Sequence, residues 1–280
     1  MQVQVIHPAI RSAVVTVSLM VWAGASAAHC SRAVQVPVSA TGYSVVIEGQ
    51  SVRGIYPEML KSISDKENCR FAMTPVPRAR LEKLFETGKA DMIVAAQRST
   101  HRDEFGVFVP MVRSRATLIS LDDAQRAPFK NFQELVDHKE ARLVVVRGYD
   151  YGSGYQDLID TLSHDNRVVF EVDPQAVGRL LKSNPGDVTI MVPTILYGAM
   201  QEDPRLRDQL DKLRIEPLDN LVWGESGVYL AKAMEPGLFK YLLAAMQRAA
   251  QSGTVHKGFA SYYPVQVLKD SIKPLDRPQP

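Results

Sequence analysis

The sequence predicts an α/β fold of two lobes, and three observations lead to this prediction. Short runs of β-branched residues alternate with helical patterns, as in strands that are joined by crossover helices. The unit helix, strand, helix, strand occurs twice, in residues 57–97 and 132–193. A chain of 280 residues is also longer than one typical domain of roughly 100–200 residues. Two α/β lobes with largely parallel sheets are therefore expected.

Each element is expected where its period and its end signals agree. Strands are expected at 34–38, 44–48, 70–76, 92–97, 116–121, 142–146, 167–172, 188–192 and 227–231. Prolines suit first helical turns, Asn131 can cap a helix, and Gly88 and Gly253 can end one. These signals predict helices at 57–66, 78–87, 131–138, 153–162, 174–183 and 236–252.

Two polar segments are candidate crossings between the lobes, at 122–131 and at 216–220. After the second crossing the chain makes one more strand and a long helix, which fit most simply into the first lobe. The sequence therefore predicts a discontinuous lobe I, residues 28–121 and 221–280, and a lobe II, residues 122–220. Two crossings make a two-segment hinge with a cleft between the lobes.

Composition and motifs exclude several classes of function. The 33 basic and 31 acidic residues give a net charge of +2 without a basic block, which argues against nucleic-acid binding. Two cysteines without CxxC spacing and six scattered histidines make no metal-ligand set. The motifs GxSxG, HExxH, GxxxxGK[ST] and GxGxxG are absent, so no catalytic residue and no cofactor is assigned. A catalytic triad assembled from distant residues stays open.

The N-terminus has the pattern of a secretory signal peptide. Arg11 precedes an apolar run over 12–25, and Ala25-Ser26-Ala27 supplies the small-x-small pattern of a cleavage site. Residues 1–27 are therefore expected to be removed on export to the periplasm, and an uncleaved anchor helix is the alternative. His29 before Cys30 speaks against lipoprotein processing.

The two cysteines are expected to form a disulfide, because an exported protein meets an oxidising compartment. Cys30 and Cys69 each precede a strand-like segment, so their pairing would close a loop of about 40 residues. Such a loop stabilises by roughly 3 to 4 kcal/mol in the chain-entropy model. Two free thiols are the alternative.

A first candidate anion site follows the strand at 92–97. Ligands of α/β sheets bind outside the carboxyl ends of strands, and an arginine there can hold a carboxylate with two hydrogen bonds. Arg98 and Arg102 lie at this point of the chain. The alternative is a surface ion pair with Asp103 or Glu104.

A second candidate anion site is the glycine-rich turn at 148–154, between a strand and a helix. Its backbone N–H groups and the helix N-terminus suit an anion, and its tyrosines offer apolar faces and hydroxyls. Tyr149 and Ser153 are the candidate contacts. An ordinary flexible connection is the alternative.

Several segments together resemble the bacterial extracellular solute-binding protein family 3, over essentially the whole mature chain. They are GIYPEML at 54–60, PRARLEKLFETGKADMIVAA at 77–96 and STHRDEFGVF at 99–108, the last continuing into a strand that ends at Pro110. The resemblance implies the type II periplasmic-binding-protein fold. It also implies a monomer that delivers a small solute to the permease of an ABC importer for polar amino acids.

The resemblance also implies binding residues. Arg102 falls on the arginine that holds the ligand α-carboxylate, and Tyr43 falls near an aromatic residue that covers the ligand. Gln97 ends the strand where the family offers polar groups. Thr194 stands where a carboxylate usually holds the ligand ammonium, and Arg78 stands where an aromatic residue often stacks.

These departures bear on the ligand. A buried ammonium without its carboxylate costs several kcal/mol, so the site suits a carboxylate-bearing or otherwise anionic solute better than a standard amino acid. The sequence shows no obvious acid beside the two arginines. An Arg78 that extends along its own helix is the alternative for that residue.

Two other functions remain open on the same fold. Some periplasmic dehydratases of prephenate-like acids resemble these receptors, and Glu58, Glu171 and Glu225 are the carboxylates to examine for that activity. A receptor of this kind can also signal by docking on a membrane sensor.

Overall fold

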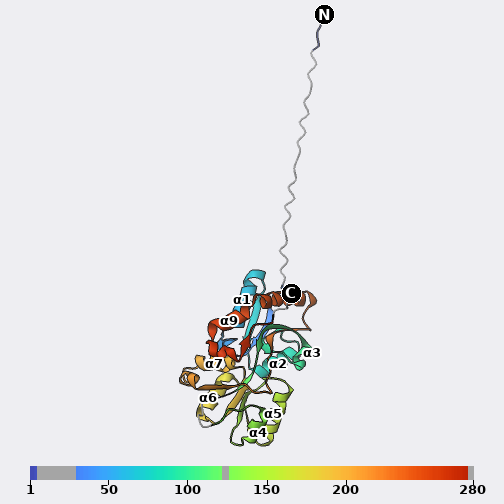
Figure 1. Ribbon diagram of the computed structural model, residues 1–280. Helices are drawn as coiled ribbons and strands as arrows, with labels where there is room; N and C mark the ends of the chain where they lie inside the picture. Colours follow the sequence, from blue (N-terminus) through green and yellow to red (C-terminus); the bar gives the residue numbers. More distant parts are fainter. Residues whose placement is uncertain (5–29, 122–125, 277–280) are drawn as a thin grey trace.

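The computed structural model describes residues 1–4, 30–121 and 126–276 as two lobes, each built on a β-sheet that is covered by helices (Figure 1). Nearly all of the expected signal peptide lies outside the described residues, so its removal remains a prediction. Within the described ranges, no helix is both long enough and apolar enough to cross a membrane.

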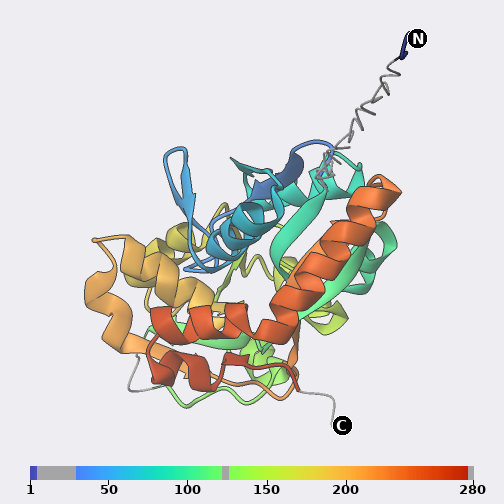
Figure 2. The same ribbon diagram turned by 90° about the horizontal axis from the view of Figure 1, so that it is seen from above.

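Lobe I is built on the four-stranded sheet β13-β6-β12-β5, with the parallel pair β1 and β4 next to β5. The long helix α8 packs on β6 and β12 (Figure 2). The strands of this lobe are β1 (Val34–Val38), β2 (Val46–Glu48), β3 (Ser51–Arg53), β4 (Phe71–Pro75), β5 (Met92–Gln97), β6 (Gly106–Ser114), β12 (Gly224–Ala231) and β13 (Ile272–Lys273). Its helices are α1 (Ile55–Glu67), α2 (Arg78–Glu86), α3 (Thr100–Phe105), α8 (Pro236–Ser252), α9 (Thr254–Tyr262) and α10 (Val265–Lys269).

Lobe II is built on the five-stranded sheet β11-β7-β10-β8-β9. Its strands are β7 (Thr117–Leu121), β8 (Leu143–Val146), β9 (Val168–Glu171), β10 (Val188–Met191) and β11 (Leu213–Glu216). Its helices are α4 (Phe132–Asp137), α5 (Ser153–His164), α6 (Pro174–Ser183), α7 (Pro193–Glu202) and the 3-10 helix η1 (Arg207–Lys212).

The alternation of side chains along β8 explains why helices cover both faces of this sheet. Leu143 and Val145 pack with apolar residues of α4 and α5, whereas Val144 and Val146 pack with those of α6 and α7. All four are buried. A strand that is buried on both faces has a continuous run of apolar residues in its sequence. The sequence of β8, LVVV, is such a run.

Strand pairing corrects two of the expectations. The predicted boundary after residue 121 assigned β7 to lobe I, but β7 is hydrogen-bonded to β10 and β11 in lobe II. The first crossing is therefore at 115–116. The sheets are also mixed, since β12 runs antiparallel to β5 and β6. Among the strands of the described residues, the parallel pairs are β1 with β4 and β8 with β9 and β10.

The two crossings lie side by side. Ser114 at the end of β6 pairs with Gly224 at the start of β12, immediately next to the points where the chain changes lobe. The guanidinium of Arg115 lies 5.1 Å from the ring of Trp223, which joins the two crossings by a cation–π contact. Two adjacent segments of this kind make a hinge.

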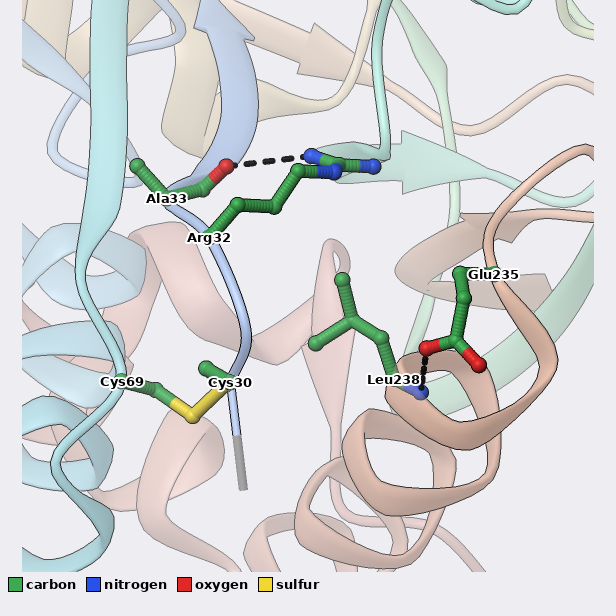
Figure 3. Close-up of a disulfide and its surroundings, with 6 residues drawn as sticks. All are labelled: Cys30, Arg32, Ala33, Cys69, Glu235 and Leu238. Atoms are coloured by element: carbon green, nitrogen blue, oxygen red, sulfur yellow. Dashed lines mark hydrogen bonds between the residues drawn. A yellow bond between two sulfur atoms is a disulfide. The ribbon is translucent and has the colours of Figure 1, made fainter. Parts of the chain in front are cut away.

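The disulfide between Cys30 and Cys69 is confirmed, with the two Cα atoms 5.2 Å apart (Figure 3). It ties together the residues that precede β1 and β4, the two strands of the parallel pair. Asp91 holds β1 from the other side, because its carboxylate accepts hydrogen bonds from the Arg32 guanidinium and from the backbone N–H of Gln35. Burial opposes the ionisation of Asp91, but these donors outweigh it and hold its pKa below the usual range.

Candidate functional site

A cavity of about 40 Å³ lies between the lobes, and both lobes contribute to its wall. Lobe I supplies residues near the carboxyl end of β5 and from neighbouring segments: Thr41, Arg78, Ala95, Gln97, Arg102 and Ser226. Lobe II supplies the turn after β8 and the start of α7: Tyr149, Asp150, Tyr151, Val192 and Ile195. The expected residues Arg78, Gln97, Arg102 and Tyr149 thus meet at one cavity.

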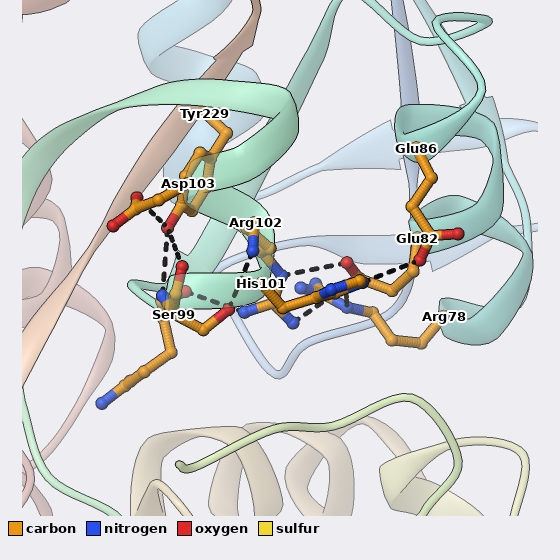
Figure 4. Close-up of polar contacts among 9 residues, drawn as sticks. Arg78, Glu82, Glu86, Ser99, His101, Arg102, Asp103 and Tyr229 are labelled. Atoms are coloured by element: carbon orange, nitrogen blue, oxygen red, sulfur yellow. Dashed lines mark hydrogen bonds and ion pairs between the residues drawn. The ribbon is translucent and has the colours of Figure 1, made fainter. Parts of the chain in front are cut away.

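The two arginines of this cavity share one carboxylate. Glu82 lies one turn after Arg78 on α2, and its oxygen Oε1 accepts from Nε of Arg78 at 2.7 Å. Arg102 approaches the same carboxylate with Nε at 2.9 Å and Nη2 at 3.1 Å (Figure 4). It also donates with Nη1 to the carbonyl of Gln97 at 2.8 Å. The expectation that no acid lies beside the arginines is wrong.

Glu82 stays ionised in this position. Burial on its own raises the pKa of the carboxyl, but Arg78 and Arg102 outweigh burial and hold the pKa of Glu82 below its usual range. Burial likewise disfavours the charged form of Arg102, and Glu82 reverses that effect, so the pKa of Arg102 is raised. The three side chains therefore form a charged cluster that is mostly shielded from solvent, with exposed fractions of 6% for Arg78, 15% for Glu82 and 5% for Arg102.

Lobe II brings hydroxyls and a carboxylate to the cavity. Burial raises the pKa of Tyr149 to about 12, while the charge of Arg78 across the cleft acts in the opposite sense. Its buried hydroxyl makes no hydrogen bond with the described residues. Asp150 accepts from the backbone N–H of Gly152 with Oδ1 at 2.9 Å, and its charge contributes to the raised pKa of Arg102.

The backbone at the cavity is strained at one position. Ala95 has a φ of 53°, in the left-handed region that disfavours residues with a side chain. The pairing of β5 with β12 shifts register here, between Gly227 and Tyr229, so a β-bulge interrupts the strand where it reaches the cavity. Such strain persists where the surrounding structure imposes it, which is common at binding sites.

The lobes touch at several points outside the cavity wall. A Cβ added to Gly148 of lobe II would lie 3.0 Å from the backbone of Ala79 in lobe I. A Cβ added to Gly198 of α7 would lie 2.7 Å from the backbone nitrogen of Tyr43. An ion pair of 2.7 Å between Arg53 and Glu202 also joins the lobes. The described conformation is therefore closed.

The other expected binding residues lie outside the cavity wall. Tyr43 stacks on Tyr262, with ring centroids 5.1 Å apart, and its backbone N–H donates to the hydroxyl of Tyr263. Ser153 is the exposed first residue of α5. Thr194 is buried in the first turn of α7. Tyr43 therefore lies at the contact between the lobes rather than against the cavity.

Other candidate charged groups lie away from the cavity as well. Arg98 pairs with Asp103 at 3.3 Å, which is the surface ion pair that the sequence left open. Glu225 lies 3.7 Å from Arg98, Glu58 accepts from the hydroxyl of Tyr262 at 2.5 Å, and Glu171 ends β9. In the part of the chain that the structure describes, no three His, Cys, Asp or Glu side chains are placed to hold a metal ion.

Sequence reasoning missed Glu82 and Asp150. The signal for Glu82 was present, because a glutamate four residues after an arginine on a helix lies on the same face. Asp150 belongs to the glycine-rich turn that was singled out, but its tyrosines and serine were preferred. The contact of Glu82 with Arg102 depends on how α2 and α3 pack within lobe I, and only the approach of Asp150 depends on the contact between the lobes.

No protein-family profile matches this sequence, and no curated protein sequence matches it either. Solved structures do match its fold. AbpA of Streptococcus pneumoniae, an amino acid ABC transporter substrate-binding protein bound to L-arginine, is 18% identical with a TM-score of 0.63, over 86% of this chain and 96% of that one. A P235GK mutant of ArgBP from T. maritima is 16% identical with a TM-score of 0.63, over 82% and 94% of the two chains.

A third match comes from a signalling protein. It is a histidine kinase sensor domain with similarity to periplasmic binding proteins, 14% identical with a TM-score of 0.61, over 82% of this chain and 96% of the domain. Identities this low establish the fold and nothing finer. The periplasmic-binding-protein fold that the sequence predicted is confirmed.

Proposed function

We propose that this protein is an exported receptor that closes two lobes over a small polar solute with an acidic group. The observation that carries the proposal is the charged cavity between the lobes, to which lobe I contributes Arg78 and Arg102 and lobe II contributes Asp150. A site divided between two lobes is complete only when they close, so the free energy of binding can set the closed population.

The charges of the cavity indicate the class of solute. The wall residues Arg78, Arg102 and Asp150, counted together with the Glu82 that pairs with both arginines, carry no net charge. A neutral site that presents a cation on one lobe and an anion on the other suits a solute with an acidic and a basic group. Asp150 thereby offers a carboxylate for the ammonium of the solute, in place of the carboxylate that is absent at Thr194.

Delivery to an ABC importer in the periplasm is the use that we propose for this binding, with the protein acting as a monomer. Two of the matched structures are named for binding arginine or for an amino acid ABC transporter. The sensor-domain match supports a second candidate, in which the closed form signals to a membrane sensor. Loss of solute uptake in cells without this protein would indicate transport, whereas unchanged uptake with altered gene expression would indicate signalling.

A thermal-shift screen of residues 28–280 tests the receptor function. A solute that binds only the folded state raises the unfolding midpoint by mass action. We expect L-arginine, L-glutamine or another solute with one acidic group and at least one basic group to raise it, and simple dicarboxylates such as succinate to have no effect. A panel of amino acids and organic acids that produces no shift would contradict the proposal.

A further inference from the structure

Glu82 binds the guanidinium of Arg102 in the way that the carboxylate of a ligand would. Both carboxylate oxygens face the edge of the guanidinium formed by Nε and Nη2, at 2.9 and 3.1 Å, which is the bidentate geometry of arginine with carboxylate ligands. The third donor direction of Arg102 is taken by the carbonyl of Gln97. Arg102 therefore has a protein acceptor for each of its three nitrogens.

Arg78 is in the opposite situation. It donates only with Nε, to Glu82, and neither of its terminal nitrogens makes a hydrogen bond with the described residues. Its side chain is 6% exposed and lines the cavity. Guanidinium donors in a mostly buried site are stabilised by acceptors, so these nitrogens favour a solute that brings one. The unpartnered, buried hydroxyl of Tyr149 lies at the same cavity.

On the basis of the receptor function proposed above, we propose that Glu82 is a resident carboxylate in the binding fork of Arg102, and that Arg78 receives the acidic group of the solute in its place. Arg102 is then a positioning residue, which holds Glu82 and through it Arg78. Glu82 is the residue that determines specificity, because it neutralises one of two arginines.

The charges at the cavity indicate which solutes Glu82 excludes. Without it, Arg78, Arg102 and Asp150 would leave one net positive charge at the cavity wall and a free bidentate fork. A solute with two acidic groups could then place one on each arginine. With Glu82 in place, a second acidic group meets a carboxylate instead of a fork, so the receptor selects solutes with a single acid.

Acetate is the probe that tests whether the fork is a carboxylate site. Glu82→Ala removes the resident carboxylate and leaves space for a small one, with both arginines still present. We expect Glu82→Ala to unfold at a lower temperature than the unchanged protein, and acetate to restore several degrees of that loss, while chloride at equal ionic strength does not. Glu86→Ala is the matched control, because Glu86 lies one turn further along α2 and pairs with exposed Lys83 and His101 outside the cavity.

Succinate tests the consequence for specificity. Glu82→Gln keeps the volume of the side chain and removes its charge, so it serves also if Glu82→Ala does not fold. We expect succinate to bind Glu82→Gln about tenfold to a hundredfold more tightly than the unchanged protein in calorimetry, the range of one charge-assisted hydrogen bond. Arg102→Lys in the Glu82→Gln background should remove that gain, since lysine lacks the fork.

The outcomes separate this inference from the receptor function. If acetate stabilises Glu82→Ala no more than it stabilises Glu86→Ala, and Glu82→Gln gains no affinity for succinate, Glu82 is not a resident carboxylate in a ligand site. That result would stand even if the unchanged protein binds amino acids. Conversely, acetate could restore the unfolding temperature of Glu82→Ala while the unchanged protein binds no solute of the screen. That result would support the role of Glu82 and overturn the receptor function.

Discussion

At the scale of single residues, local chemistry places the groups of the cavity. The side chain of Ser99 caps α3 by accepting a hydrogen bond from the backbone N–H of Arg102. This cap sets where α3 begins and so places Arg102 in its first turn. Arg78 begins α2 and lies on the same helix face as Glu82. The sequence predicted that arginines gather near the end of β5, because these signals are local. It did not predict their shared carboxylate, which depends on how α2 and α3 pack together.

Ala95 gives a prediction at this scale. A left-handed φ costs an alanine about 1–2 kcal/mol, whereas glycine adopts it freely and loses roughly 0.4–1 kcal/mol through its more flexible unfolded chain. Ala95→Gly should therefore raise the free energy of unfolding by about 0.5 kcal/mol in urea denaturation. Ala96→Gly is the control, because Ala96 is fully buried with a negative φ and should lose stability. Equal losses in both variants would show that Ala95 is not strained.

At the scale of elements, periodicity predicted best where strands are short and continuous. The expected bounds of β1 and β5 agree with the structure to the residue, and those of α2 and α6 to within one. The strand expected to end at Pro110 instead continues as β6 to Ser114. A proline usually ends a strand, but here it lies opposite Gly227 at a register shift, where the pairing is already interrupted.

Elements without a pattern of their own were missed. The helix α7 begins with Pro193 and Thr194 shortly after β10, and the sequence predicted no helix there, only Thr194 as a binding residue. Its apolar residues face both lobe II and the contact with lobe I, so no single amphipathic face marks it as a helix. Similarly, β11 and β13 are edge strands of few residues, whose pairing depends on distant parts of the chain.

The disulfide gives a prediction at the scale of elements. It joins the starts of β1 and β4 across 39 residues, a loop for which the chain-entropy model gives about 3–4 kcal/mol. Reduction should therefore lower the unfolding midpoint by about 6–16 °C in scanning calorimetry, at roughly 2–4 °C per kcal/mol. Free thiols in the denatured, unreduced protein, or an unchanged midpoint after reduction, would show that this bond does not stabilise the exported chain.

At the scale of the whole molecule, closure brings the cavity groups together. The wall combines lobe I residues near the carboxyl end of β5 and from neighbouring segments with lobe II residues that follow β8 and β10. The two crossings beside Ser114 and Gly224 allow the lobes to move as units. The division into two lobes was predicted from length and from the repeated unit. The boundary at β7 was not, because only hydrogen bonding assigns a strand to its sheet.

Gly198 tests whether closure is needed for binding. A Cβ at this position would lie 2.7 Å from the backbone of Tyr43 and 2.8 Å from Gly42, so Gly198→Ala should hold the lobes apart. We expect a larger radius of gyration by small-angle scattering and at least about tenfold weaker solute binding, equivalent to about 1.4 kcal/mol. Gly186→Ala, where a Cβ would meet nothing within 4 Å, is the control. If both variants bind and scatter as the unchanged protein does, the glycine contact does not control closure.

The measurement that tests the central claim most directly is a calorimetric titration of the best solute from the screen into three proteins. They are the unchanged chain, Arg78→Ala, and Arg80→Ala, in which an exposed arginine of the same helix is removed. The account predicts binding of one solute per chain, a loss of at least about tenfold in affinity in Arg78→Ala, and no change in Arg80→Ala. Equal affinity in all three proteins would show that the solute does not bind at the cavity between the lobes.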